Sequence, residues 1–559
     1  MPFQTVFSRR TFLRGLGAGV LAASVVRPAS AHSGRDPVFQ HGVASGDPLA
    51  DRVVIWTRVS TESMGKVPVL WEVARDPGFR RIVRSGRTLT HAGVDYTVKI
   101  DVSGLPAGAR LFYRFRAHGR FSPTGRTRTL PHGGLDQLKL AVFSCSNYPA
   151  GYFHAYSEAA RLDDVFASVH LGDYIYEYGR DGYASGDAAA LGREVEPAGE
   201  LLALADYRRR YAQYRSDPDL QALHAAMPMI AVWDDHEISN DAWREGAENH
   251  DPATEGAYAW RRAAALRAYH EWLPTRLTDP HKPRQIYRSF AFGDLLSLHM
   301  LDTRIVGRDR QLEYADYFGA SGFDAAAFQT DLADPQRQLL GSEQADWLAQ
   351  QFARSATTWD VLGQQVLMGR MNIPAPLVLG QIGFSDYSAL LGQAQTAPAT
   401  LTPEQLALLA QPAIPYNLDA WDGYAVARET VLGTARALDK NLVVLSGDTH
   451  NAWASDLHDI AGNAVGVEFA TPSVSSPGLE EYFPAEDPVL VASGLTQIIG
   501  PLQYANTHQR GFMLVTATHE SCEAEWRYVD TVKHPDYQTI QGPTLRTLPG
   551  AGNRRIVAA

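Results

Sequence analysis

The chain has 559 residues, 45% of them hydrophobic and 20% charged, so it can bury a sizeable core and is neither disordered nor fibrous. Its 51 Lys and Arg face 62 Asp and Glu, and the net charge of −11 argues against a nucleic-acid-binding module, which needs a basic footprint. Two cysteines are too few for a disulfide framework.

Residues 1–31 are predicted to be an export signal. Ser8–Leu13 reads Ser-Arg-Arg-Thr-Phe-Leu, a twin-arginine signature, and an uncharged stretch follows from Gly15 to Val26. A bilayer-spanning helix needs about 20 residues, so this stretch is too short to be a stable membrane anchor, and Ala29–Ala31 fits a cleavage site. Removing the four arginines of the signal leaves 47 basic and 62 acidic residues, a net charge of −15. We expect the twin-arginine export machinery to deliver the protein to the periplasm or outside the cell.

Residues 32–131 are predicted to form a small N-terminal Ig-like β-sandwich domain. Short runs rich in β-branched and aromatic residues are separated by turn signals, as is typical of antiparallel β-structure. These runs are 52–58, 67–73, 96–102 and 111–116. Tyr113 follows a turn at the start of a strand, which favours the tyrosine corner of Ig-like sandwiches.

Residues 132–559 are predicted to form an α/β catalytic domain. A buried strand at 138–144, a helix at 153–162 and a strand at 165–171 make a βαβ unit. Further strands are expected at 229–233, 295–301, 359–363 and 441–446. Residues 371–425, rich in Ala, Gln, Leu and Pro, are interpreted as an insertion packed near the core, and the arginines of 208–210 as a solvated helix face.

Polar side chains follow each of these core strands. They are Cys145 after the first strand, Asp173 and Tyr176 after the second, Asp235 and His236 after the third, Gln364 and Gln365 after the strand at 359–363, and Asp448 and His450 after the last. Ligands gather at the carboxyl ends of strands in open α/β sheets, so we expect these side chains at one edge. Thiolate, imidazole and carboxylate are standard metal ligands, and carboxylates suit hard ions such as Ca²⁺ or Mg²⁺.

Taken singly, these signals have other interpretations. A Gly-Asp after a strand is often a turn, and Cys145 could be a small buried hydrophobe or could pair with Cys522. Other catalytic motifs are missing from the sequence. His236-Glu237 lacks the second His of a zinc-protease helix, and neither a Gly-x-Ser-x-Gly elbow nor a phosphate-binding Gly-rich loop occurs.

The order of these motifs resembles the alkaline phosphatase D (PhoD-like) family of metallophosphoesterases over nearly the whole chain after the signal. The motifs are His41–Pro48, Val54–Arg58, Phe143–Ser146, Gly172–Tyr176, Trp233–Glu237, Leu301–Arg304 and Ser446–His450. The resemblance implies a metallophosphoesterase-type α/β sandwich core behind the small β-domain.

The resemblance also implies one Fe³⁺ and two Ca²⁺ ions. By motif position Cys145, Asp173, Tyr176 and His450 would hold iron, with Asp173 bridging, and Asp235 and Asp448 would hold calcium. Gln364 is the expected ligand after the strand at 359–363, with Gln365 left open as the alternative. His236 would contact the phosphoryl group, and Arg304 would clamp a phosphate oxygen.

We therefore expect an exported phosphoesterase, a monomer, whose substrates are phosphate mono- and diesters. Clustered cations would neutralise the phosphate charge and lower the pKa of a bound water, giving a metal-bound hydroxide as the nucleophile. One alternative is a secreted phospholipase D-type phosphodiesterase. Another, of a different class, is a non-catalytic phosphate- or glycan-binding protein on the same fold, although the intact Asp173, His236 and Asp448 speak against it.

Overall fold

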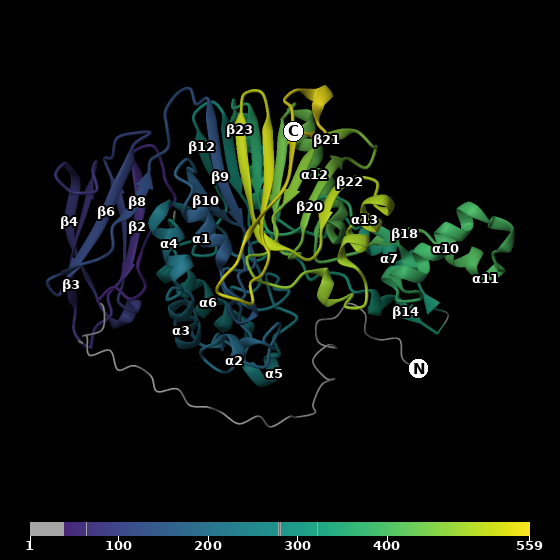
Figure 1. The fold of residues 1–559 in the computed structure, drawn as a ribbon, viewed down its shortest axis with the longest axis horizontal. Helices are drawn as coiled ribbons and strands as arrows, with labels where there is room; N and C mark the ends of the chain where they lie inside the picture. The colour runs from purple at the N-terminus through teal and green to yellow at the C-terminus, as the bar shows by residue number, and fades with distance from the viewer. Residues whose placement is uncertain (1–37, 63, 278, 280, 321) are drawn as a thin grey trace.

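The computed structural model describes residues 38–559 except 63, 278, 280 and 321. The predicted signal at residues 1–31 lies outside the described residues. Two large mixed sheets pack against each other at the centre of the molecule, and a smaller sheet lies at one end (Figure 1).

The first large sheet has ten strands among the described residues. In spatial order they are β26 (Val557–Ala558), β25 (Thr539–Thr547), β24 (Cys522–Val529), β23 (Arg510–Thr518), β9 (Gln137–Phe143), β10 (Ala167–His170), β11 (Met229–Ala231), β1 (Val43–Gly46), β2 (Arg52–Arg58) and β5 (Thr97–Ser103). Strands β9, β10, β11 and β1 are parallel, and the outer pairs are antiparallel.

The second large sheet has seven described strands. Their order is β12 (Arg288–Phe292), β13 (Leu296–Met300), β16 (Trp359–Gly363), β19 (Leu442–Ser446), β21 (Ala464–Ala470), β20 (Ala452–His458) and β22 (Leu502–Asn506). Strands β13, β16, β19 and β21 are parallel. The predicted strands of the α/β core are thus confirmed, but they are divided between two sheets.

Alternation along the strands of the second sheet explains why both of its faces are buried. On β19, Val443 and Leu445 join the core cluster shared with the first sheet, whereas Leu442 and Val444 join a second cluster on the opposite face. Parallel strands covered on both faces carry such continuous apolar runs.

Helices cover the outer face of each sheet. The first sheet packs against α1 (His154–Ala160), α3 (Leu204–Tyr214), α4 (Pro218–Ala226) and α6 (Tyr258–Trp272), and the second against α8 (Ser342–Arg354), α12 (Ala425–Ala437) and α13 (Pro488–Ile498). Further helices are α2 (Ala188–Leu191), α5 (Pro252–Glu255), α7 (Ala325–Leu332) and α9 (Ala375–Val378). No helix among the described residues has the length and apolar character needed to cross a membrane.

The N-terminal strands belong to two sheets. Strands β1, β2 and β5 extend the first large sheet, because β1 pairs with β11. The others form a separate sheet of β4 (Ile82–Thr90), β3 (Val67–Ala74), β6 (Arg110–Ala117), β7 (Arg120–Phe121) and β8 (Gly125–Arg128). A third apolar cluster fills the space between them. The predicted tyrosine corner is wrong: among the described residues, no backbone carbonyl accepts a hydrogen bond from the buried Tyr113 hydroxyl.

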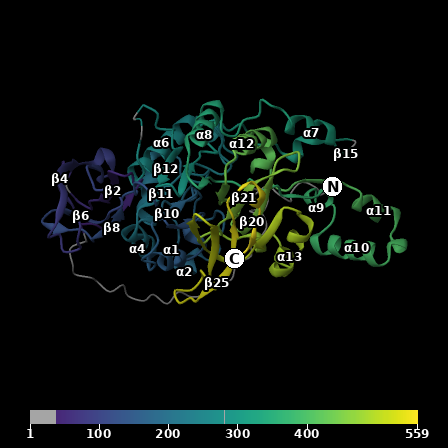
Figure 2. The same ribbon diagram turned by 90° about the horizontal axis from the view of Figure 1, so that it is seen from above.

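Residues 371–425 contain a two-stranded sheet, β17 (Asn372–Pro374) and β18 (Ala413–Pro415), and helices α10 (Phe384–Thr396) and α11 (Pro403–Leu409). Helices α10 and α11 project from the body of the protein in both views (Figures 1 and 2). In Figure 1 they lie beyond the small hairpin of β14 (Phe318–Gly319) and β15 (Gly322–Phe323). Ile414 and Trp421, by contrast, pack into the second core cluster.

Candidate metal centre

The site forms where the strand ends of both sheets meet. Strands β9, β10 and β11 of the first sheet deliver Cys145, Asp173 and Asp235, whereas β13 and β19 of the second deliver Arg304 and Asp448. The expectation of a single sheet edge is wrong, because the apolar faces of the two sheets pack together and bring their carboxyl ends to one place.

The loops after these strands bend sharply at the candidate ligands. Cys145, Asp173, Asp448 and His450 all have φ between 55° and 63°, a region that non-glycine residues rarely occupy. Gly172, at φ 115°, precedes Asp173, and a Cβ there would lie 2.3 Å from Cβ of Asp234. Only glycine therefore permits this close approach of two site loops.

The four predicted iron ligands converge. Oδ2 of Asp173 lies 3.4 Å from Sγ of Cys145 and 3.1 Å from Oη of Tyr176, which is itself 3.1 Å from Nε2 of His450. Cys145 and Cys522 are both free and buried, so the alternative of a disulfide between them is wrong. Burial, with Asp173 alongside, raises the pKa of the Cys145 thiol and of the Tyr176 phenol well above their ordinary values.

Cys145, Asp173 and His450 form the first of three groups of possible ligand atoms, and the other two groups lie next to it. Asp173, Asp235 and His236 form the second group, and Asp234, Asp235 and Asp448 form the third. The ligand atoms of each group lie within 4.8 Å of one another. Because Asp173 and Asp235 each belong to two groups, the three positions form one continuous cluster.

His236 is held from two sides. Its Nδ1 lies 2.7 Å from Oε2 of Glu177, and its ring stacks on Tyr176 with centroids 4.2 Å apart. Burial by itself lowers the pKa of His236, but the carboxylates of Asp235 and Glu177 raise it to about 10. In return His236 helps to lower the pKa of Glu177 against the opposing effect of burial. The pair thus fixes the orientation of the His236 ring.

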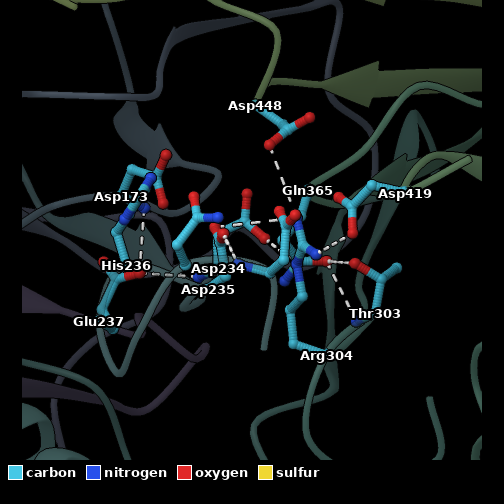
Figure 3. Close-up of polar contacts among 12 residues, drawn as sticks. Asp173, Asp234, Asp235, His236, Glu237, Thr303, Arg304, Gln365, Asp419 and Asp448 are labelled. Atoms are coloured by element: carbon cyan, nitrogen blue, oxygen red, sulfur yellow. Dashed lines mark hydrogen bonds and ion pairs between the residues drawn. The ribbon is translucent and has the colours of Figure 1, made fainter. Parts of the chain in front are cut away.

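Arg304 lies among carboxylates (Figure 3). Its Nε is 2.5 Å from Oδ1 of Asp234 and its Nη1 is 2.7 Å from Oδ1 of Asp419, while Nη2 lies 3.5 Å from Asp448 and 3.7 Å from Asp235. The side chain is fully buried. This geometry makes Arg304 a counter-charge for the acidic cluster.

Replacing Arg304 with methionine is expected to lower the free energy of unfolding by about 3–5 kcal/mol, because it leaves buried carboxylates without their cation. Urea denaturation with metals chelated measures this change. The control is Arg310→Met: Arg310 is exposed and its ion pair with Glu313 lies at the surface, so the change should be below about 1 kcal/mol. Equal stability of the Arg304→Met variant and the unmodified protein would contradict the counter-charge role.

The amide groups of Gln364 and Gln365 are engaged elsewhere. Gln364 donates from Nε2 to the Val366 carbonyl at 2.5 Å, and its Oε1 accepts from Trp421 Nε1 at 3.1 Å. Gln365 accepts from Thr303 Oγ1 at 2.7 Å and donates to the Trp233 carbonyl at 2.7 Å. Neither side chain is presented as a ligand here; instead, Gln365 ties the strand ends of the two sheets together.

Two buried charged groups shape the loops. Glu237 accepts hydrogen bonds from the backbone amides of Asp173, Tyr174 and Asp234, at 2.6–3.0 Å. Arg210 donates to the backbone carbonyls of Tyr176 and Tyr178. The prediction of a solvated 208–210 face is therefore wrong for Arg210, which is fully buried because the Tyr176 loop needs a donor for its carbonyl groups.

Four site residues were missed by sequence reasoning. Asp234 stands beside Asp235 in a motif already selected, and Glu177 and Glu237 lie within or next to selected motifs, so their carboxylates were visible signals. Asp419 lies in the 371–425 segment and carries no local signal, since only the fold brings it to Arg304.

The donor set fits a site for several cations. Asp173 Oδ1 and Asp234 Oδ2 are buried and make no hydrogen bond to any described residue. Burial raises the pKa of both carboxyls, so their ionised forms are poorly stabilised by the protein alone. Cations bound between these oxygens would supply the missing charge, and the thiol, phenol and imidazole beside Asp173 would give one position a softer, more basic ligand set.

Comparison with known proteins identifies the enzyme class. The chain is 34% identical over 556 residues to alkaline phosphatase D of Bacillus subtilis (strain 168), covering 95% of this chain and 85% of that protein. A solved structure described as the structure of PhoD matches with a TM-score of 0.76 and 32% identity, covering 95% of this chain and 94% of that one. The protein is a phosphoric ester hydrolase.

The family follows from matches to two family models. Residues 140–526 match the PhoD-like phosphatase model, and residues 24–131 match the model of the N-terminal domain of PhoD-like phosphatases. The chain therefore belongs to the PhoD-like phosphatase family.

Proposed function

We propose that the protein is an exported, metal-dependent phosphoesterase that hydrolyses phosphate mono- and diesters. The observation that carries this proposal is the continuous cluster from Cys145 through Asp173 and Asp235 to Asp448, which gathers anionic ligands at the meeting point of two sheets. When bound, cations there would neutralise the phosphate charge and lower the pKa of a bound water.

Side chains of the protein would donate the proton and hold the ligand carboxylates in position. His236, positioned by Glu177, donates a proton or hydrogen bond to the oxygen on which charge develops as the ester bond breaks. Arg304 and Asp419 hold the carboxylates of Asp234 and Asp448 in place. The proposal includes a monomer with one Fe³⁺ and two Ca²⁺ ions.

The layered core supports a finer assignment of the fold. Two sheets packed face to face, each covered by helices, match what a metallophosphoesterase-type sandwich requires. The apolar cluster between the N-terminal sheets supports an Ig-like sandwich for residues 32–131.

Metal analysis of the purified protein alongside a panel of phosphate monoesters and diesters tests the proposed function. We expect bound iron and calcium, and turnover of esters in both classes. Metal-free protein with full turnover would contradict metal dependence. Binding of phosphate esters without turnover would favour the non-catalytic alternative, and activity confined to phospholipids would favour the phospholipase D-type alternative.

Removal of calcium is expected to abolish turnover, because Asp234, Asp235 and Asp448 offer only hard oxygen ligands to a cation. A calcium-selective chelator should inactivate the enzyme, and added Ca²⁺ should restore activity, as followed by hydrolysis of a soluble monoester. The same chelator presaturated with Ca²⁺ is the control. Restoration by Zn²⁺ but not by Ca²⁺ would contradict the assignment.

Replacement of Arg9 and Arg10 by Lys is expected to retain the protein in the cytoplasm, because twin-arginine export reads this pair. Cell fractionation followed by intact-mass measurement checks the outcome, and exported unmodified protein should begin at His32. Replacement of Arg14 by Lys, a conservative change outside the pair, is the control. An uncleaved exported chain would overturn the cleavage position.

A further inference from the structure

The N-terminal part of the chain is charged oppositely to the rest. Between residues 38 and 131 there are 15 Lys and Arg against 7 Asp and Glu, a net charge of +8. Residues 132–559 carry 31 against 54, a net charge of −23. The active site proposed above lies wholly in the acidic part, so this basic charge is not part of that site.

Part of this positive charge lies on the outer face of the sheet β4-β3-β6-β7. This sheet stands at one end of the molecule (Figure 1). One row across four strands reads Arg87, Leu70, Arg116 and Phe121, because Leu70 pairs with both Arg87 and Arg116, and Arg116 pairs with Phe121. The opposite face of the same strands is buried in the third apolar cluster. We call the row and its neighbour Leu89 the basic-apolar face.

The arginines of this face are not neutralised by the protein. Among the described residues, no carboxylate forms an ion pair with Arg87 or Arg116, although both side chains are exposed. Arg116 lies over the ring of Phe121 at 5.3 Å from its centroid, which holds the guanidinium at the surface.

Leu70 lies between these two arginines in the row, and all three apolar side chains of the face are open to solvent. Leu70 is 47% exposed, Leu89 57% and Phe121 49%. A soluble polyanion would use the arginines alone and gain nothing from exposed leucines. A lipid bilayer with anionic headgroups uses both, because its phosphates pair with arginine and its acyl boundary accepts leucine and phenylalanine.

We propose that the basic-apolar face is a reversible docking surface for a membrane rich in anionic phospholipid. Arg87 and Arg116 bind lipid phosphate groups, and Leu70, Leu89 and Phe121 enter the headgroup-acyl boundary. The net charge of −23 on residues 132–559 repels the same membrane. The protein therefore binds through its N-terminal end, with the acidic part directed away from the membrane.

Vesicle co-sedimentation of the full chain tests this proposal. All variants begin and end at the same residues, so that any contribution of residues 1–37 to binding is the same in each of them. The chain should bind phosphatidylglycerol-containing vesicles and not pure phosphatidylcholine, and binding should weaken as salt rises. The double variant Arg87→Gln/Arg116→Gln should weaken binding about 25-fold, at about fivefold per arginine. Leu70→Ser/Leu89→Ser should also weaken it.

The matched control is Arg284→Gln/Arg354→Gln, two exposed arginines in the acidic part, which should bind as the unmodified chain does. Turnover of a soluble monoester should be unchanged in all variants, which shows that they are folded. Absence of binding to anionic vesicles overturns the proposal. So does retention of full binding by the Leu70→Ser/Leu89→Ser variant together with complete competition by inorganic polyphosphate, which identifies a soluble polyanion. Concentration-dependent self-association that Arg87→Gln/Arg116→Gln abolishes also overturns it, by identifying a second copy of the chain.

Discussion

Replacement of His236 by Ala is expected to reduce kcat by about 10²–10⁴-fold, the loss typical of a positioned proton donor. His236 is fully buried against Tyr176, and Glu177 engages its Nδ1, so the chain holds the imidazole in a fixed orientation at the cluster of ligands. The alanine variant removes that donor without touching the carboxylates. Steady-state kinetics on a phosphate monoester, with metal content measured on the same samples, checks the outcome.

The metal content decides between two roles for His236. Its ring also lies in the group of ligand atoms with Asp173 and Asp235. Unchanged metal with reduced kcat supports the proton donor, whereas loss of metal in proportion to activity would make His236 a ligand and contradict the proposed role. Glu177→Gln is the matched variant: it keeps the shape of the side chain but removes the charge that orients His236, and should reduce kcat by about 10–100-fold.

Replacement of Tyr176 by Phe is expected to bleach or shift a visible absorption band of the protein. The proposal places Fe³⁺ beside Cys145 and Tyr176, and charge transfer from a thiolate or phenolate to ferric iron gives colour. Burial raises the pKa of both groups, so only a strongly Lewis-acidic ion would hold them deprotonated at neutral pH. The visible spectrum of the purified protein measures the band directly.

Cysteine variants separate the iron ligand from a merely buried thiol. Cys145→Ser should weaken iron retention, because the hydroxyl is a poorer ligand for this ion than the thiolate. Cys522→Ala is the control, since Cys522 is equally buried on β24 but belongs to none of the groups of ligand atoms. A colourless, iron-free and fully active unmodified enzyme would contradict the iron assignment, regardless of the results for the cysteine variants.

The sequence by itself determined which polar residues follow the core strands and in which order those strands occur along the chain. Apolar runs such as Leu442–Ser446 are long enough only for buried strands, and polar residues directly after them must lie at strand ends. That local logic placed Cys145, Asp173 and Asp448 correctly, because a loop after a buried strand has few other positions available. It also found the α/β alternation, since helical and strand periodicities differ.

Only the tertiary structure decided which strand ends share a site. Strand β9 leads to Cys145 in one sheet and β19 to Asp448 in the other, and no periodicity distinguishes two packed sheets from one wide sheet. The same limit applies to Arg304 and Asp419, which are 115 residues apart and meet because both core clusters must close around the second sheet. Burial of apolar surface is non-directional along the chain, so it selects partners that local sequence patterns do not encode.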